Sequence, residues 1–461
     1  MLTITFLSIL GLVLLFLGFN NQIRLTKNLA TVGVLVALGI LLFANQNLLI
    51  PEGMETQLNF DASSLKFSGL ILGFSAFILM LTRSFISKDT VQSAEFLAVL
   101  VFSMVGALML TSFTHMITLF VGLETLGISL YVLAGTDKSS PSSNEAALKY
   151  LLMGAFATCL VLFGMAMLYG ATGSLDFAEI ASKGMQSVDS VLFKLGIFFL
   201  LIGILFKVSA APFHFWSPDV YEGSPSIVML YMSVVVKIAS FAALFRIFGN
   251  YFHNLSFFWW DVVYYCCIAS LLLGNLLALV QKSLKRQLAF SSISQTGYLL
   301  FAILVVNTEA VTNGLVFYLF AYGTSLLVAF SVLTSWFDSS ENIYLNQLKG
   351  AGKADPTGGF VLTLAFLSMA GIPLTGGFFS KLFMFAPAMG DGLIHLLLVG
   401  IISSVIGAAY YLKPIMNVWF STENPSIENA SSLKWVSLIG GVLILVAGLF
   451  PDTISSILDL I

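Results

Sequence analysis

Charge is scarce in this chain of 461 residues, because only 9% of them are Asp, Glu, Lys or Arg and the net charge is −3. A soluble globular protein carries about 25% charged residues, so this chain cannot cover itself with a water-facing surface. Hydrophobic residues make up 58% of the sequence, and phenylalanine alone occurs 42 times. The composition excludes a cytosolic enzyme, a nucleic-acid-binding protein and a disordered regulator. It indicates a protein whose solvent is lipid.

Cysteine and histidine are also scarce. The three cysteines form no C-x-x-C pair and lie inside apolar runs, at Cys159, Cys266 and Cys267. This arrangement is not that of a disulfide framework or a metal site. The four histidines are scattered along the chain, at His115, His214, His253 and His395. We interpret them as packing or interfacial residues in preference to haem or metal ligands, and we expect the chain to bind no metal and no redox cofactor.

The first 19 residues are apolar from the second position onward, and they lack the basic segment and the small-residue cleavage site of a signal peptide. We therefore expect this stretch to be a retained membrane helix.

Long apolar runs recur along the whole chain without the alternation that a membrane β-barrel requires. A membrane helix needs about 20 apolar residues, so the pattern predicts an all-α polytopic membrane protein of about 14 helices. We place them at residues 2–19, 29–49, 64–83, 92–111, 113–134, 146–171, 190–214, 225–249, 257–280, 286–307, 311–337, 357–388, 393–420 and 433–450.

Basic residues between these helices favour one orientation. If the N-terminus lies outside, the cytoplasmic loops hold twelve of them: Arg24, Lys27, Arg83, Lys88, Lys138, Lys149, Lys282, Lys285, Arg286, Lys349, Lys353 and Lys434. The opposite loops hold four: Lys66, Lys183, Lys194 and Arg246. Positive residues concentrate on the cytoplasmic side, so we expect both termini to face the periplasm.

A few charges remain inside predicted helices. They are Glu124, Lys207, Lys237 and Lys381, with Lys413 closer to a helix end. A central lysine costs about 2.5–3.5 kcal/mol on insertion scales, and ionisable residues inside a membrane are typical of proton relays. Salt bridges or side chains that reach back to the interface are the structural alternative. We expect Glu124 and Lys207 to form an electrostatic pair, and Lys413 to be interfacial.

Helix-breaking residues accompany two of these lysines. Lys207 lies five residues before Pro212, and Lys381 follows Pro373 and a Gly-Gly pair. Proline in a helix interior removes a hydrogen bond, and irregular backbone at membrane depth lines a wet cavity or is buried in protein. A packing kink explains either segment alone, but it explains both together poorly.

The spacing of the lysines indicates an internal repeat. Lys207 and Lys381 are 174 residues apart, and Lys237 and Lys413 are 176 apart. Five predicted helices separate the two copies, so the copies have opposite orientations. Inverted repeats with discontinuous helices at matching positions are typical of ion transporters.

Four segments carry a family resemblance: FKVSAAPFHFWSPDVYEGSPS, VVVKIA, SLKRQLAFSSISQTGY and MAGIPLTGGFFSK. They resemble the antiporter-like membrane subunits of bacterial respiratory complex I, the NADH:quinone oxidoreductase, and the resemblance extends over nearly the whole chain. It implies 14 helices, with inverted repeats at helices 4–8 and 9–13 and discontinuous helices 7 and 12. It also implies a proton relay in which Glu124, Lys207, Lys237 and Lys381 take part, and a less certain role for His214.

The chain departs from the larger subunits of this family. Gln295 stands where those subunits carry a histidine in helix 10, helix 11 has no histidine, and no long lateral helix follows Phe450. The resemblance therefore points to a smaller member. Without the helix-10 histidine, a path between Lys237 and Lys381 needs water or one of three side chains: Gln295, Tyr298 or Tyr322.

These observations predict a proton-translocating membrane subunit of complex I in the bacterial inner membrane. The expected divisions are residues 1–90 with three N-terminal helices, 91–251 with the first repeat, 256–421 with the inverted repeat, and 432–461 with helix 14 and a tail. NADH, flavin, iron–sulfur clusters and quinone would belong to other subunits, which with the lipid bilayer are the expected partners, and we expect no nucleic acid. The alternatives are a cation/proton antiporter subunit of the multisubunit sodium type, a hydrogenase-linked relative, or a structural helix bundle.

Overall fold

A computed structural model of the chain describes residues 1–20, 23–44, 57–85, 93–186, 189–306, 308–337, 343–421, 427 and 434–459. The regular elements in these residues are helices, and only three isolated β-bridges pair extended residues there.

The helices follow the apolar runs of the sequence. The α-helices are α1 Leu2–Leu17, α2 Ile23–Phe43, α3 Ala62–Phe85, α4 Ser93–Ser112, α5 Met116–Ala134, α6 Pro141–Thr172, α7 Phe177–Gly184, α8 Val191–Lys207, α9 Trp216–Gly223, α10 Ser226–Tyr231, α11 Lys237–Leu244, α12 Trp260–Leu279, α13 Leu284–Leu304, α14 Glu309–Trp336, α15 Ala351–Ala354, α16 Pro356–Ala370, α17 Gly376–Gly390, α18 Ile394–Phe420, α19 Lys434–Leu449 and α20 Pro451–Asp459. Short 3-10 helices lie at Gly18–Asn20, His253–Phe258 and Leu345–Leu348.

Ten helices in the described part of the chain are long and apolar enough to cross a membrane. A bent pair adds an eleventh if it counts as one span, because α19 and α20 meet at an angle of 108°. Two further helices, α1 and α16, are apolar but shorter. The all-α polytopic class expected from the sequence is confirmed.

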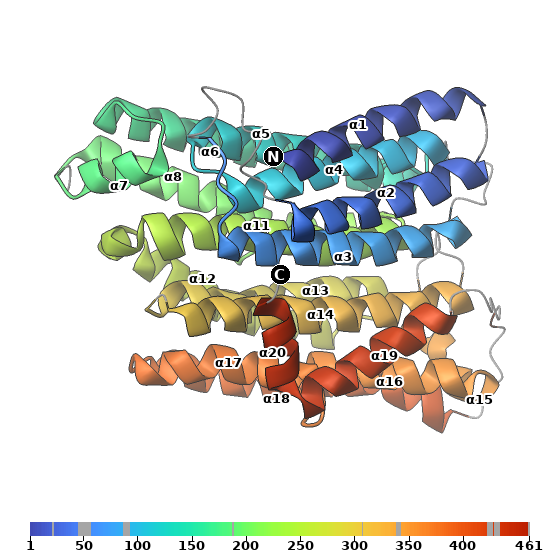
Figure 1. The fold of residues 1–461 in the computed structure, drawn as a ribbon. Coiled ribbons are helices and arrows are strands. Elements are labelled where there is room, and N and C mark those ends of the chain that lie inside the picture. Colours follow the sequence, from blue (N-terminus) through green and yellow to red (C-terminus); the bar gives the residue numbers. More distant parts are fainter. Residues whose placement is uncertain are drawn as a thin grey trace.

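The helices lie side by side in one bundle, and α20 runs across its neighbours (Figure 1). The most apolar windows of Ser226–Tyr251 and of α13 are wholly buried, and that of α14 is nearly so. By contrast, only a third of the corresponding window is buried in α2, α6 and α18. The lysine-bearing segment Ser226–Tyr251 therefore lies in the centre of the bundle, and α2, α6 and α18 lie on its outside.

Small residues bring three helix pairs into backbone contact. A Cβ atom added at Gly106 on α4 would lie 2.5 Å from the backbone nitrogen of Leu126 on α5. The equivalent distance is 2.6 Å from Gly164 on α6 to α8, and 2.5 Å from Gly274 on α12 to α13. Small residues are the usual means of close helix packing in membranes, so these three seams are specified locally by glycine.

The helical structure is interrupted at both places where the sequence predicts a break. Helix α8 ends at Lys207 and α9 begins at Trp216, and α16 ends at Ala370 and α17 begins at Gly376. Left-handed backbone occurs in both gaps, at Ser209 (φ 59°) in the first and at Gly371 (φ 82°) and Leu374 (φ 75°) in the second. A left-handed conformation ends an α-helix, so each pair of half-helices is separated by irregular backbone.

A departure from regular helix that the sequence did not predict surrounds Lys237. The segments Met232–Val236 and Phe245–Tyr251 are π-helical, and α11 between them begins at Lys237. We expected one regular helix over residues 225–249. Single-turn π-helical segments are rare and occur frequently at functional sites.

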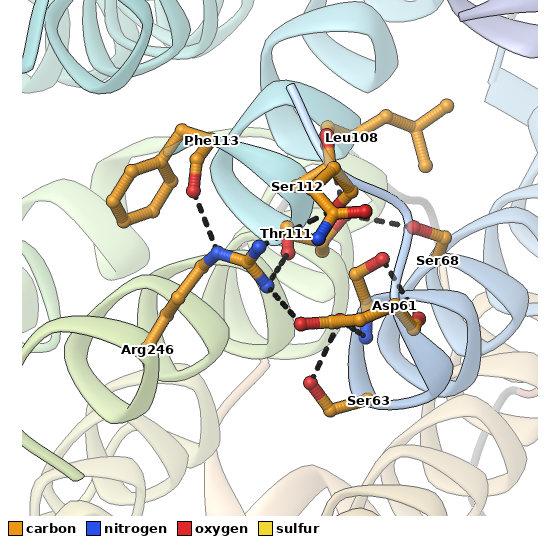
Figure 2. A network of polar contacts seen from close by, with 10 residues as sticks. Asp61, Ser63, Ser68, Leu108, Thr111, Ser112, Phe113 and Arg246 are labelled. Carbon is orange, nitrogen blue, oxygen red and sulfur yellow. Dashed lines mark hydrogen bonds and ion pairs between the residues drawn. The ribbon is translucent and has the colours of Figure 1, made fainter. Parts of the chain in front are cut away.

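Arg246 was counted among the basic residues of the loops, but its side chain is buried (Figure 2). Its Nε donates to the Phe113 carbonyl at 2.6 Å, and its Nη1 donates to the Asp61 carboxylate at 2.9 Å and to the Thr111 carbonyl at 3.3 Å. Its Nη2 donates to the Asn59 carbonyl at 3.3 Å. Because carbonyls and a carboxylate surround the guanidinium, it joins the start of α3, the end of α4 and the segment that carries Lys237.

Two other lysines counted as loop residues are also buried. Lys66 on α3 donates to the Asn313 side chain on α14 at 2.8 Å, and Lys285 on α13 contacts the Ser224 carbonyl at 3.4 Å. Both were counted among the loop cations, whereas polar partners from distant segments hold them inside the bundle. Lys88 and the side chains of Arg24, Arg83 and Lys434 lie outside the described residues.

Candidate functional site

The four charged residues singled out from the sequence occupy four helices. Glu124 lies on α5, Lys207 is the last residue of α8, Lys237 is the first residue of α11, and Lys381 lies on α17. The side chains of Lys237 and Lys381 are 4% and 7% exposed, and Glu124 and Lys207 are half-buried. Each lysine therefore lies at a helix interruption or beside one.

The Lys207 ammonium lies over an aromatic ring and close to the backbone of α5. Its Nζ lies 5.7 Å from the centre of the Tyr150 ring. It also lies 3.5 Å from the point that a Cβ of Gly127 would occupy, and the Tyr131 hydroxyl lies 3.2 Å from the same point. Glycine at position 127 therefore lets the ammonium approach the backbone of α5. Tyr150 in turn stacks on Trp216, the first residue of α9, with ring centres 4.6 Å apart.

Glu124 lies near Lys207 without pairing with it. No ion pair joins the two side chains in the described structure. Glu124 lies one turn before Gly127 on α5, and its charge attracts the Lys207 ammonium. The geometry is therefore that of a separated pair, in which charge is felt without direct contact.

Lys237 is held by polar groups of α13. Its Nζ donates to the Ser292 carbonyl at 2.5 Å, to the Ser292 hydroxyl at 2.6 Å and to the Thr296 hydroxyl at 3.1 Å. The Thr296 hydroxyl donates in turn to the carbonyl of Val208, the residue after Lys207, at 2.9 Å. Hydroxyl and carbonyl groups therefore connect the Lys237 ammonium to the first helix break.

The ammonium of Lys381, which lies on α17, meets the C-terminal end of the preceding half-helix α16. Its Nζ donates to the carbonyl of Ala370, the last residue of α16, at 2.7 Å, and to the Ser404 hydroxyl of α18 at 2.8 Å. The same atom lies 4.9 Å from the centre of the Tyr298 ring. The C-terminal end of a helix carries partial negative charge, so α16 stabilises the ammonium without a carboxylate.

A small buried cavity lies between α13, α14 and α17. Its lining includes Gln295, Tyr318, Tyr322, Ser368 and Lys381. It has room for about one water molecule. Gln295 and Tyr322 therefore line the same cavity as Lys381. They are two of the three side chains expected to connect Lys237 with Lys381.

His214 and Lys413 stand apart from these contacts. His214 lies in the first break, where its buried ring stacks on Phe215 with ring centres 4.6 Å apart. Its Nδ1 has no hydrogen-bond partner among the described residues. Lys413 is exposed on α18. The lysine that matches Lys237 in sequence spacing therefore does not share its buried setting.

An ion-pair cluster that sequence reasoning missed joins α6, α9 and α13. Arg286 donates to Asp219 at 2.8 Å and to Glu222 at 2.9 Å. Lys149 contacts Asp219 at 2.8 Å and Glu145 at 2.8 Å. Both cations were expected in loops. Glu145 lies one turn before Lys149 on α6, whereas Asp219 and Glu222 lie on α9, so only the packing of separate helices shows that these two acids face the cations.

The hydroxyl partners of the lysines were also missed. Ser292, Thr296 and Ser404 each accept a hydrogen bond from a buried ammonium. One signal for the first two was present in the sequence, since SSISQT is a polar run inside a stretch long enough to be a membrane helix. In a wholly buried helix such a run must find internal partners. No cluster of three or more His, Cys, Asp or Glu that could hold a metal occurs in the described residues.

Comparison with known proteins assigns the family. A family model described as "NADH:quinone oxidoreductase/Mrp antiporter, TM" matches residues 113–407. NADH-quinone oxidoreductase subunit N of Flavobacterium psychrophilum is 34% identical over 458 residues, which cover 99% of this chain and 100% of that protein.

Solved structures agree with this assignment. A chain of respiratory complex I from Thermus thermophilus, solved with bound aureothin, has a TM-score of 0.86 and 32% identity, with 99% of both chains covered. A chain of the Mrp complex from Dietzia sp. DQ12-45-1b has a TM-score of 0.82 at 18% identity, covering 99% of this chain and 96% of that one, and it shows the fold alone. The chain belongs to the family of NADH:quinone oxidoreductase and Mrp antiporter transmembrane subunits.

Proposed function

We propose that this chain is the proton-translocating N subunit of a bacterial NADH:quinone oxidoreductase. It works as a multi-pass protein of the inner membrane, with other membrane subunits of the complex as its partners. The observation that carries the proposal is the setting of Lys237 and Lys381, which are buried ammonium groups whose hydrogen-bond partners are neutral hydroxyls and carbonyls.

Neutral partners suit a lysine that must release its proton. Burial disfavours the charged form of an amine, and a carboxylate in contact would restore it. Ser292, Thr296 and Ser404 stabilise the ammonium by hydrogen bonds but supply no countercharge. The proton can therefore leave when a neighbouring charge changes, without the cost of breaking a salt bridge.

The four charged residues take distinct roles in this relay. Glu124 sets the field at Lys207, and the three lysines pass protons in the order Lys207, Lys237 and Lys381. His214, in the break after Lys207, has an accessory role. Work done elsewhere in the complex reaches this chain through neighbouring subunits as a change in charge or position near the relay.

The relay lies on a repeated framework. We place helices 4–8 of 14 in residues 91–251 and helices 9–13 in an inverted copy at residues 256–421. Helices 1–3 fall in residues 1–90 and helix 14 with its tail in residues 432–461. The discontinuous helices are then α8–α9 and α16–α17, and both termini face the periplasm.

The chain contributes to the enzyme without redox chemistry of its own. NADH, flavin, iron–sulfur clusters and quinone are bound by other subunits of the complex. A cation/proton antiporter subunit of the Mrp type is the second candidate, because the fold is shared with that complex. The extensive similarity to a subunit N sequence favours the NADH:quinone oxidoreductase.

The decisive experiment replaces the two buried lysines in the assembled complex. Lys381→Met and Lys237→Met are each expected to leave the complex assembled and to lower proton uptake into vesicles by about tenfold. Lys381→Arg should restore little, because a guanidinium holds its proton too tightly to release it near neutral pH. NADH:quinone turnover and proton uptake are measured on the same membranes.

Lys413→Met provides the matched control, because Lys413 is an exposed lysine of α18. It should pump normally. Full pumping by both buried-lysine variants would refute the relay, and loss of assembly without loss of pumping per assembled complex would return these lysines to a structural role.

A further inference from the structure

The step between Lys237 and Lys381 has no direct contact in the described structure. Lys237 is bound by α13, and Lys381 by α16 and α18. A proton that leaves one amine for the other must therefore cross the space between them through a group that can both accept and donate. The small cavity beside Lys381 is lined by residues of both α13 and α14, and it offers a place for such a group.

Tyr322 on α14 is placed to serve both lysines. Its ring centre lies 5.5 Å from the Lys237 Nζ, and the same residue lines the cavity that Lys381 lines. Ser292, whose hydroxyl Lys237 contacts at 2.6 Å, also lies near the Tyr322 side chain. One side chain therefore extends from the surroundings of Lys237 to those of Lys381.

The Tyr322 hydroxyl is also uncommitted. It is buried, with the residue only 5% exposed, and it makes no hydrogen bond to another protein group among the described residues. An unpaired buried hydroxyl costs about 1–3 kcal/mol, so its persistence beside a polar cavity calls for a partner there. A water molecule in the cavity would supply that partner.

The other polar groups of this region are already engaged. The Tyr318 hydroxyl donates to the Gln295 side-chain carbonyl, and the Gln295 amide donates to the Tyr411 hydroxyl at 3.2 Å and to the Met369 carbonyl at 3.4 Å. The Tyr298 hydroxyl donates to the Gly400 carbonyl at 3.3 Å. Of the residues that could bridge the gap, Gln295 therefore braces helices, and Tyr322 retains a free hydroxyl.

We propose that the Tyr322 hydroxyl, together with one water molecule in the cavity, carries the proton from Lys237 to Lys381. This step rests on the function proposed above and names the bridging group for it. The Lys237 ammonium gives a proton toward the tyrosine oxygen, directly or through the Ser292 hydroxyl. The tyrosine proton passes to the water, and a water proton passes to the neutral Lys381 amine.

The step moves one proton and changes no other group. Lys237 ends as a neutral amine and Lys381 as an ammonium, while Tyr322 and the water each regain the proton that they gave. A buried phenolate would be costly. Concerted transfer avoids it, because the hydroxyl accepts as it donates.

The test compares two buried tyrosines, one in the cavity and one outside it, in the assembled complex. Tyr322→Phe keeps the ring beneath Lys237 and removes only the hydroxyl, and it should lower proton uptake per NADH oxidised by about tenfold. Tyr410→Phe is the matched control, because its buried hydroxyl donates to the Asn275 side chain at 3.0 Å and the residue does not line the cavity. It should retain most of the pumping. Proton uptake is followed in inverted vesicles with equal amounts of assembled complex.

A second variant blocks the water rather than the hydroxyl. Ala321 lines the same cavity, so Ala321→Val should fill it and slow proton uptake while Tyr322 remains intact. Loss of pumping in both Tyr322→Phe and Ala321→Val, with Tyr410→Phe active, supports the bridge. Normal pumping by Tyr322→Phe overturns it. If Lys381→Met pumps normally as well, the proposed relay has failed; if Lys381→Met is inactive, only the bridge has failed.

Discussion

The three lysines of the proposed relay differ in what surrounds them. The Lys381 ammonium meets the end of a half-helix, and the Lys237 ammonium meets hydroxyls and a carbonyl. The Lys207 ammonium lies over the Tyr150 ring, with Glu124 near it but not in contact. Aromatic faces attract a cation by about 0.5–2 kcal/mol, which is less than a salt bridge in a dry site would supply. Lys207 is therefore the lysine whose charge depends most on Glu124.

Replacement of Glu124 tests this dependence. Glu124→Gln should slow proton uptake several-fold, because the amide removes the negative charge that attracts the Lys207 ammonium across the gap. Glu124→Asp keeps the charge at shorter reach and should be milder. The measurement is proton uptake per NADH oxidised in vesicles that contain equal amounts of assembled complex.

Glu179→Gln serves as the control for that experiment. Glu179 is an exposed glutamate of α7 that pairs with Lys183 at 3.4 Å, away from the relay. Its loss should leave pumping unchanged. If Glu124→Gln pumps at the normal rate, the carboxylate has a structural role only.

The sequence identified four charges inside helices, but it missed the buried Arg246, Lys66 and Lys285 and did not reveal what holds any of them. Glu124, Lys207, Lys237 and Lys381 stand out because each interrupts a long apolar run. Ser404 accepts a hydrogen bond from Lys381 across 23 residues, and Ser292 accepts one from Lys237 across 55. Serine is common in membrane helices, so only the packing of distant helices reveals which serines face an ammonium.

At the scale of elements, the α16–α17 junction depends on close contact between two half-helices. Ser368 on α16 accepts a hydrogen bond from the Gly377 backbone at 3.2 Å. A Cβ at Gly377 would lie 1.7 Å from the Ser368 carbonyl oxygen. The two half-helices therefore overlap at a point where any side chain would push them apart.

Gly377→Ala should accordingly destabilise the assembled subunit by about 1–3 kcal/mol, the usual cost of overpacking. Gly390→Ala is the matched control on the same helix, because a Cβ there meets no atom within 4 Å. The temperature at which the complex dissociates should fall for the first variant and stay nearly constant for the second. Equal thermal stability of both would show that the junction can relax.

Helix positions were predictable from the sequence, and their interiors were less so. Apolar length located the segments, and Pro212 and Pro373 located the two breaks. The segment 190–214 was expected to remain helical to its end, whereas α8 stops at Lys207. The π-helical turns around Lys237 could not be predicted from the sequence, because they arise from a change in hydrogen-bond register rather than from particular residues.

At the scale of the whole molecule, Arg246 joins parts of the chain that lie more than 130 residues apart. Its partners Asp61 and Phe113 belong to the start of α3 and the end of α4 (Figure 2). Removal of one member of a buried charged network leaves the others without compensation. This network therefore fixes the segment of Lys237 relative to the N-terminal helices.

Arg246→Met is expected to destabilise the subunit by about 3 kcal/mol, measured as a lower dissociation temperature of the complex. Asp61→Asn should cost less, since the amide can still accept a hydrogen bond from the guanidinium. Lys194→Met, which removes an exposed cation of α8, should have little effect. If the Arg246→Met subunit were as stable as the wild type, the other contacts between these helices would be sufficient to hold them in place.

The large sequence separation between Lys237 and its hydrogen-bond partners has a consequence for biogenesis. Its partner Thr296 follows it by 59 residues, whereas the Ala370 carbonyl that binds Lys381 precedes that lysine by 11. At a synthesis rate of about 5–20 residues per second, Lys237 exists for roughly 3–12 s before Thr296 has been made. During that interval a nascent chain carries an ammonium whose partners do not yet exist. The insertion machinery must therefore shelter the first half of the protein until the second half arrives, while Lys381 enters the membrane with a partner already in place.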